Sequence, residues 1–183
     1  LASLYQRCSQ EPAPVAILSR DKDLAQVFQR DVDYLWDYSD QKRFFREDIA
    51  AKFGVRCDQL VAYQALLGDS IDDIAGVPGV GAKTAAALLG QGVELAELLA
   101  NPEQIAAFPI RGAKSLALKI PEYREQIQLA QQLAALVSDI PLIDSSAQLQ
   151  RKSVNCEQLA DFCQRMGWSA GMVKRLTAPF SAP

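Results

Sequence analysis

The stretch that decides the fold is GDSIDDIAGVPGVGAKTAAALL, from Gly68 to Leu89. It opens with crowded aspartate and serine side chains, passes through a glycine-rich turn around one proline, and ends in an alanine-rich segment that begins with a lysine. Glycine can adopt backbone angles closed to other residues, and it lets the chain approach a ligand closely. The stretch therefore predicts a helix–hairpin–helix element with acidic side chains directly before the hairpin.

The hairpin and the start of the second helix are expected to bind an anion. Backbone amides at a helix N-terminus point outward with the helix dipole behind them, and this suits a phosphate. Such contacts position a DNA duplex without reading its bases. A plain turn between helices is the alternative, but the apolar residues on both sides of G-V-P-G-V-G-A-K-T-A favour DNA binding. The candidate DNA-binding residues here are Gly76, Gly79, Gly81, Lys83 and Thr84.

Two pairs of carboxylates are candidate metal ligands. Asp69 and Asp72 are three residues apart, so on a helical turn they would share a face. Asp21 and Asp23 follow Val15–Ser19, which is typical of a buried parallel strand, and ligands bind beyond the carboxyl ends of such strands. Clustered carboxylates repel one another, and Mg²⁺ relieves that repulsion. Helix capping is the better interpretation of Asp21 or Asp23 taken alone, whereas metal ligation is favoured for Asp69 and Asp72.

The composition argues against several other kinds of site. The 183 residues suffice for one domain, or for one domain with a subdomain. The net charge of -3 gives no hint of nucleic acid, so any basic surface must be local. The chain has no histidine and no C-x-x-C pair among its four cysteines, which argues against zinc sites and histidine-based triads. Reduced thiols and the lack of an apolar run of about 18 residues predict a cytoplasmic protein outside the membrane.

The remaining sequence is mainly helical, with a small α/β part at its start. The alternating segment Asp31–Tyr38 predicts a second strand near an edge of the sheet. Strand signals fade from about Arg46, and helices follow, the longest of them opening on Pro121. Ile140–Asp144 is expected to be a short strand, and two further helices are expected after it.

Three segments together resemble the 5'-nuclease family: SRDKDLAQVF (19–28), LVAYQALLGDSIDDIAGVPGVGAKTAAALL (60–89) and FPIRGAKSLALKI (108–120). This family includes the 5'→3' exonuclease domain of bacterial DNA polymerase I, exonuclease-IX-like proteins and flap endonucleases. The resemblance implies the C-terminal portion of a PIN-like 5'-nuclease fold with a helix-three-turn-helix DNA-binding element. The division it implies is residues 1–45 as part of the α/β nuclease core, 46–140 as the DNA-binding region and 141–183 as a C-terminal return segment.

The resemblance also implies two-metal hydrolysis of DNA at 5' ends and flaps, with Mg²⁺ or Mn²⁺ as the cofactor. Carried over by motif, the metal ligands, mainly of the second, substrate-side metal, would be Asp21, Asp23, Asp69 and Asp72. Arg111 and Lys114 match the R-G-A-K motif and would add phosphate contacts, with surface solubility as the alternative.

The resemblance implies a potassium ion as well, bound by main-chain carbonyls of the hairpin. The candidate carbonyls are those of Ile74, Val77 and Val80. The family often has asparagine where this chain has Asp73, which we interpret as a helix cap. The family's leading strands and its further acidic residues have no counterpart here, so we expect a monomeric fragment that binds DNA without a complete active site. A non-catalytic helix-hairpin-helix module for duplex DNA is the alternative.

Overall fold

The computed structural model describes residues 1–150 and 152–178, and the chain divides into two compact units. Unit 1 is Leu1–Asp144 and unit 2 is Ser145–Pro183. No helix in the described ranges is both long and apolar enough to span a membrane. The division at 45 and 140 stays a prediction, and residues 151 and 179–183 of its third region lie outside the described residues.

Unit 1 contains a three-stranded sheet in the order β1-β2-β3. β1 (Ala16–Leu18) pairs in parallel with β2 (Tyr34–Asp37), which pairs antiparallel with β3 (Lys42–Phe44). The two predicted strands are confirmed, but the predicted edge position of the second is wrong, because β2 is central. β3 was not predicted, since two charged residues in a row conceal the apolar alternation of a strand.

The buried carboxylate of Asp33, just before β2, ties this sheet to the first helix, α1 (Ala2–Cys8). It accepts hydrogen bonds from the Tyr5 hydroxyl at 2.7 Å and from the Val15 N–H at 2.8 Å. The Arg30 guanidinium donates two more, at 2.6 and 2.9 Å. Burial opposes the charge of Asp33, but these donors outweigh it and hold the pKa of the carboxyl below its usual value.

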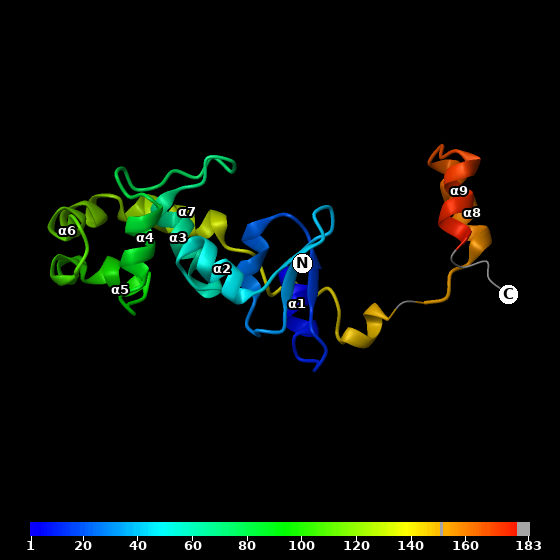
Figure 1. The fold of residues 1–183 in the computed structure, drawn as a ribbon, viewed down its shortest axis with the longest axis horizontal. Coiled ribbons are helices and arrows are strands. Elements are labelled where there is room, and N and C mark those ends of the chain that lie inside the picture. The colour runs from blue at the N-terminus through cyan, green and yellow to red at the C-terminus, as the bar shows by residue number, and fades with distance from the viewer. Residues whose placement is uncertain (151, 179–183) are drawn as a thin grey trace. The chain divides into compact units, whose positions relative to one another are not determined.

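The helical body of unit 1 follows the sheet. Its helices are α2 (Arg46–Phe53), η2 (Cys57–Gln59), α3 (Leu60–Leu67), α4 (Ala82–Leu89), α5 (Leu95–Ala100), η3 (Pro102–Ala107), α6 (Ala113–Glu122) and α7 (Arg124–Ala134). Figure 1 shows α3 to α7 gathered at one end of the unit and the strands toward the other. The helices pack around fully buried aliphatic side chains, among them Leu66, Leu88, Leu98, Ile105, Ile120 and Ile127. Burial of this apolar surface, rather than helix propensity, holds such short helices together.

Two further predictions about the helical body are wrong. Pro121 lies within the last turn of α6 instead of opening the next helix, because the backbone leaves the helical region only at Tyr123. Residues 140–144 are irregular and form no strand, and Ile140 and Leu142 are exposed, so this segment has no face buried in a core.

Unit 2 contains η4 (Ser146–Leu149), α8 (Cys156–Arg165) and α9 (Ala170–Thr177). The side chains of Asn155 and Ser169 accept hydrogen bonds from backbone N–H groups and cap α8 and α9. The two predicted C-terminal helices are therefore confirmed, as is a mainly helical fold with a small α/β part.

Candidate metal and nucleic-acid site

The acidic residues before the hairpin lie on a short closed loop between α3 and the hairpin. The N–H of Asp69 donates to the Ile74 carbonyl at 2.9 Å, and the N–H of Ile74 donates back to the Asp69 carbonyl at 2.8 Å. Asp73 takes a left-handed conformation, with a φ of 55°, to close the loop. The helical turn predicted for Asp69 and Asp72 is therefore wrong, as is the helix cap expected at Asp73.

The loop is closed at its base by two glycines that pack backbone against backbone. A Cβ atom on Gly76 would lie 2.2 Å from the carbonyl carbon and oxygen of Leu67, and one on Gly68 would lie 2.6 Å from the Gly76 nitrogen. Gly68 also has a φ of +83°, which L side chains rarely adopt. The N–H of Val77 then donates to the Leu66 carbonyl at 2.9 Å. The hairpin therefore starts in direct backbone contact with the end of α3.

Three carboxylates meet at this acidic loop. Asp23, Asp69 and Asp72 each offer one carboxylate oxygen, and these oxygens lie within 4.8 Å of one another. Asp23 lies in η1 (Lys22–Val27), so the chain reaches the cluster from two distant segments. The Asp69 side chain is 9% exposed and that of Asp23 is 19% exposed. Carboxylate oxygens are the donors that Mg²⁺ and Mn²⁺ prefer, so this acidic cluster (Asp23, Asp69 and Asp72) fits a divalent cation.

Lys22 places an ammonium group in the acidic cluster. Its Nζ lies 3.0 Å from Asp69 Oδ2 and 3.4 Å from Asp23 Oδ1. Burial disfavours the charged lysine, but the bond to Asp69 and the charge of Asp23 outweigh that effect and raise the pKa of Lys22. The pKa of Asp69 is lowered, mainly by the Ile71 N–H that its Oδ1 accepts and then by Lys22. Lys22 is therefore a second source of stabilisation for the Asp69 carboxylate, and the sequence did not indicate this role although Lys22 stands inside the D-K-D motif.

Asp21 lies outside the acidic cluster. Its Oδ1 accepts the N–H of Asp23 at 3.0 Å and caps η1, and its own N–H donates to Ser19 Oγ at 3.0 Å. This is helix capping, the alternative to metal ligation that the sequence favours for Asp21 taken alone.

The hairpin beyond Gly76 is a tight turn over residues 77–80. The N–H of Val80 donates to the Val77 carbonyl at 2.9 Å, and Gly79 has a φ of +79°. Proline at the second position and a left-handed glycine at the third are the signature of a type II turn. Gly81 is the N-cap of α4, and a Cβ there would meet nothing within 4 Å. Lys83 is exposed in the first turn of α4, and Thr84 beside it is half-buried.

Two side chains from α6 and α7 hold the hairpin in place. The Lys119 ammonium donates to the Pro78 carbonyl at 2.7 Å. The Gln126 amide donates to the Gly76 carbonyl at 2.8 Å and to the Ala75 carbonyl at 3.2 Å. The sequence carries no local signal for these contacts, because they join residues more than forty positions apart. Arg111 and Lys114, predicted to contact DNA, are exposed at the start of α6.

The carbonyls proposed for potassium lie in the same hairpin. Those of Ile74 and Val77 already accept the N–H groups of Asp69 and Val80. A carbonyl oxygen has two lone pairs, so each retains one for a cation. The Lys119 ammonium at the Pro78 carbonyl already supplies one positive charge at this turn.

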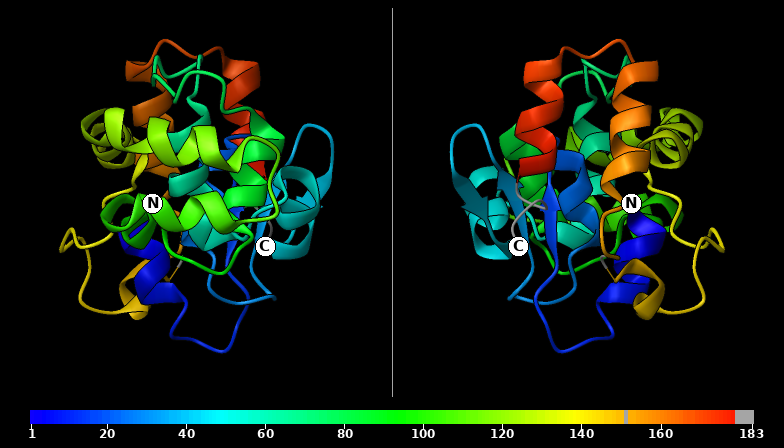
Figure 2. Two further views of the ribbon diagram at one scale, coloured as in Figure 1. Left: turned by 90° about the vertical axis from the view of Figure 1, so that its left-hand side faces the viewer. Right: turned by 90° about the vertical axis from the view of Figure 1, so that its right-hand side faces the viewer.

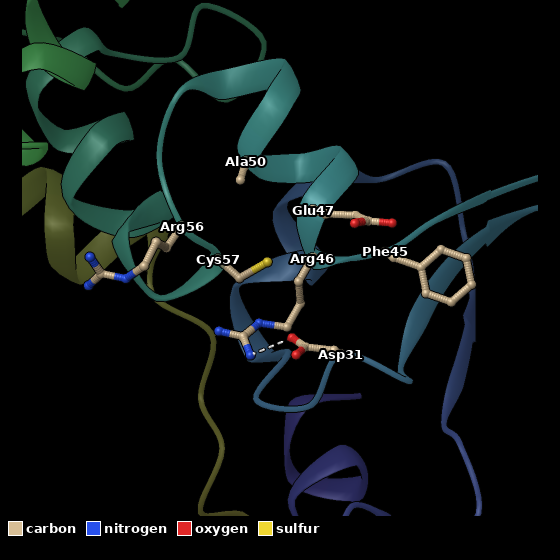
Figure 3. Close-up of a pocket in the computed structure, with 7 residues that line it drawn as sticks. All are labelled: Asp31, Phe45, Arg46, Glu47, Ala50, Arg56 and Cys57. Carbon is tan, nitrogen blue, oxygen red and sulfur yellow. Dashed lines mark hydrogen bonds and ion pairs between the residues drawn. The ribbon is translucent and has the colours of Figure 1, made fainter.

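A pocket of about 550 Å³ lies elsewhere in unit 1, between α2 and the loop before β2. Figure 3 shows the Arg46 guanidinium facing Asp31, with the Cys57 thiol beside it. Arg46 Nη1 lies 3.0 Å from Asp31 Oδ1. Burial raises the pKa of the Cys57 thiol despite the neighbouring arginine, so the thiol stays protonated and is a poor nucleophile. None of the predicted site residues lines this pocket.

The family of the chain is shown by comparison with known sequences. Residues 55–157 match the family model described as "5'-3' exonuclease, C-terminal SAM fold". DNA polymerase I of Pseudomonas aeruginosa is 38% identical over 143 residues, 78% of this chain and 16% of that protein. A 5'-3' exonuclease of Buchnera aphidicola (subspecies Schizaphis graminum) is 31% identical over 161 residues, 88% of this chain and 56% of that protein. The chain thus spans little more than half of the exonuclease and a small part of the polymerase.

Solved structures show the same fold. The T5 5'-exonuclease with bound zinc ions matches with a TM-score of 0.58 and 19% identity, over 73% of this chain and 47% of that one. A complex of the T5 D15 flap endonuclease with DNA and metal ions matches with a TM-score of 0.59 and 18% identity, over the same shares. The fold is that of a 5'-nuclease C-terminal portion. The chain belongs to the 5'-3' exonuclease family.

Proposed function

We propose that this chain is the DNA-binding and metal-binding portion of a 5'→3' exonuclease or flap endonuclease that hydrolyses DNA phosphodiesters. The observation that carries the proposal is the meeting of three carboxylates at the base of a glycine hairpin of the type that binds phosphate. Membership of the 5'-3' exonuclease family supports the reaction class. The proposed substrate is DNA with 5' ends or flaps.

In this proposal Asp23, Asp69 and Asp72 hold a divalent cation, Mg²⁺ or Mn²⁺. Bound cations of this kind supply a nucleophile from water and stabilise the leaving oxygen of a phosphodiester. The described residues contain one group of three carboxylates able to hold a metal, whereas two-metal hydrolysis needs a second set of ligands. We therefore propose that the chain binds DNA but does not cut it by itself.

The hairpin holds a phosphate of the duplex at some distance from the acidic cluster. Gly76 sets the hairpin against α3, Gly79 makes its turn, and Gly81 leaves the start of α4 open to a ligand. Lys83, Arg111 and Lys114 add exposed positive charge, and Thr84 adds a hydroxyl group. Potassium at the carbonyls of Ile74, Val77 and Val80 would bridge hairpin and phosphate.

The test is a Mn²⁺ titration of the 183-residue chain followed by electron paramagnetic resonance. The double variant Asp69→Asn/Asp72→Asn should lose most Mn²⁺ binding, because it removes two of three anionic ligands. Asp31→Asn is the matched control, since that aspartate is 90% exposed and paired with Arg46. Equal Mn²⁺ affinity in both variants would refute the metal site.

Duplex binding and cleavage test the rest of the proposal. DNA affinity of the double variant should be kept or increased, because two negative charges near phosphate are gone. DNA binding by a chain that binds no Mn²⁺ would favour the non-catalytic module instead. Chelator-sensitive cleavage of a 5'-flap substrate by the 183-residue chain would overturn the statement that it does not cut alone.

A further inference from the structure

A second pocket, of about 250 Å³, opens where α2 meets the hairpin of β2 and β3. Figure 2 shows that hairpin and α2 side by side, both in cyan tones. The floor of the pocket is apolar and includes Leu35, Ile49 and Phe53. Its volume lies below the range of about 300–1,000 Å³ typical of drug-sized ligands. The pocket therefore suits a small group such as a phosphate.

The rim of this pocket is strongly basic for a chain whose net charge is -3. Four cationic side chains, Arg20, Lys22, Lys42 and Lys52, and two acidic ones, Asp37 and Asp40, line it. The pocket thus carries a net charge of +2, over an apolar floor that strengthens charge interactions by lowering the local dielectric constant.

Two of the four cations are available to a ligand. The nearly buried carboxylate of Asp37 is taken by Arg20, at 3.1 Å, and by the N–H of Asp40, at 3.2 Å. Lys42 stands directly opposite Asp37 in the β2–β3 register, yet it forms no ion pair within the described residues. Lys52 likewise has no ion pair there, and its ammonium lies 5.3 Å from the centre of the Phe53 ring.

The pocket adjoins the acidic cluster through Lys22. This lysine lines the pocket, and its Nζ lies 3.0 Å from Asp69 Oδ2. A strand whose one phosphate lies at the cluster would place another phosphate of the same strand within reach of the pocket.

We propose that this pocket binds a phosphate of the DNA strand, with Lys42 and Lys52 as its principal cations. The proposal rests on the proposed function, because it takes DNA as the ligand of the acidic cluster beside it. It adds a third contact with the strand, separate from the cluster and from the hairpin at residues 76–84. The phosphate is either the terminal 5'-phosphate or an internal phosphodiester.

The test measures duplex binding by the 183-residue chain with fluorescence anisotropy at several salt concentrations and without divalent metal. The double variant Lys42→Ala/Lys52→Ala should reduce the slope of log affinity against log salt by about one, as expected for one lost phosphate contact. At about 0.1 M salt that change corresponds to roughly tenfold weaker binding.

Arg43→Ala is the matched control for charge on the same strand. Arg43 lies between Lys42 and Phe44 but packs over the rings of Tyr34 and Trp36, at 5.0 and 5.6 Å, on the other face of the sheet. Its removal should leave the salt slope unchanged. Circular dichroism checks folding, and the Lys42→Arg/Lys52→Arg pair should keep the wild-type slope even if the alanine pair fails to fold.

Lys83→Ala in the hairpin separates failure of this proposal from failure of the proposed function. Weaker binding by Lys83→Ala, with a wild-type slope in the pocket variant, would overturn the pocket and leave the proposed function intact. Wild-type affinity in both variants, or no duplex binding at all, would overturn both.

A parallel measurement with 5'-phosphoryl and 5'-hydroxyl strands identifies the phosphate. If Lys42→Ala/Lys52→Ala loses affinity for 5'-phosphoryl DNA only, the pocket binds the terminal phosphate. If this variant loses affinity equally for both kinds of strand, the pocket binds an internal phosphodiester.

Discussion

Replacing Gly76 by alanine should break the contact between the hairpin and α3. The new Cβ would stand 2.2 Å from the Leu67 carbonyl, whereas ordinary contacts begin at 3.4 Å. Both partners are backbone, so the two segments must separate by about 1.2 Å, the difference between these distances. That separation also strains the hydrogen bond between the Val77 N–H and the Leu66 carbonyl. Overpacking costs about 1–3 kcal/mol and a hydrogen bond about 1 kcal/mol, so we expect a loss of about 3 kcal/mol.

Urea denaturation followed by circular dichroism measures this loss. With a slope of about 2 kcal/mol per molar urea, the unfolding midpoint should fall by about 1.5 M. Gly81→Ala is the matched control, because its Cβ meets nothing within 4 Å. Alanine is a poorer N-cap than glycine, so this change should cost about 0.5–1 kcal/mol, well below the loss expected for Gly76→Ala. Equal midpoints for the two variants would refute the packing role of Gly76.

Other regions give further predictions. Asp33→Asn should lower the free energy of unfolding by about 3 kcal/mol, because it removes the buried negative charge that pairs with Arg30; an unchanged urea midpoint would contradict this. Since the pKa of Asp33 is lowered by folding, its stabilisation is complete above the unfolded value of about 3.9 and is lost as pH falls through the folded value. The wild type and this variant should therefore converge in stability in acid. Lys119→Ala should speed amide exchange at the 77–80 turn several-fold, as measured by NMR, because Pro78 loses its donor. Ellman's reagent should modify the half-buried Cys8 before the buried Cys57, and the reverse order would refute the protected state of that thiol.

The parts of the fold that were predicted from the sequence depend on local chemistry. Pro78 and Gly79 specify their turn through their own backbone preferences, and the apolar run at residues 15–19 specifies a strand by composition alone. β3 is not predicted from the sequence, because its pairing with β2, rather than its own residue pattern, makes it a strand. The acidic loop was assigned the wrong local structure, since the bridge between Asp69 and Ile74 closes it in place of a helical turn.

The candidate site likewise combines residues that the sequence identifies with contacts that only the tertiary fold creates. The sequence singled out Asp23, Asp69 and Asp72 as candidate ligands, and the fold brings them together. The clamp on the hairpin by Lys119 and Gln126 is purely tertiary, so no spacing rule could have found it. The sequence favours a ligand-facing role for Gly76, while the structure shows it packed against the backbone at the end of α3, a contact that depends on how the short loop at residues 68–76 closes.

Lys22 stands at the boundary between the acidic cluster and the basic pocket, and its ammonium is paired with Asp69 and Asp23 of the cluster. A divalent cation entering the cluster must compete with this internal cation. On the proposed assignments, a lysine displaced by metal would be free to meet a phosphate in the pocket beside it. Metal and DNA would then each favour the binding of the other, and by thermodynamic linkage the two enhancements of affinity must be equal.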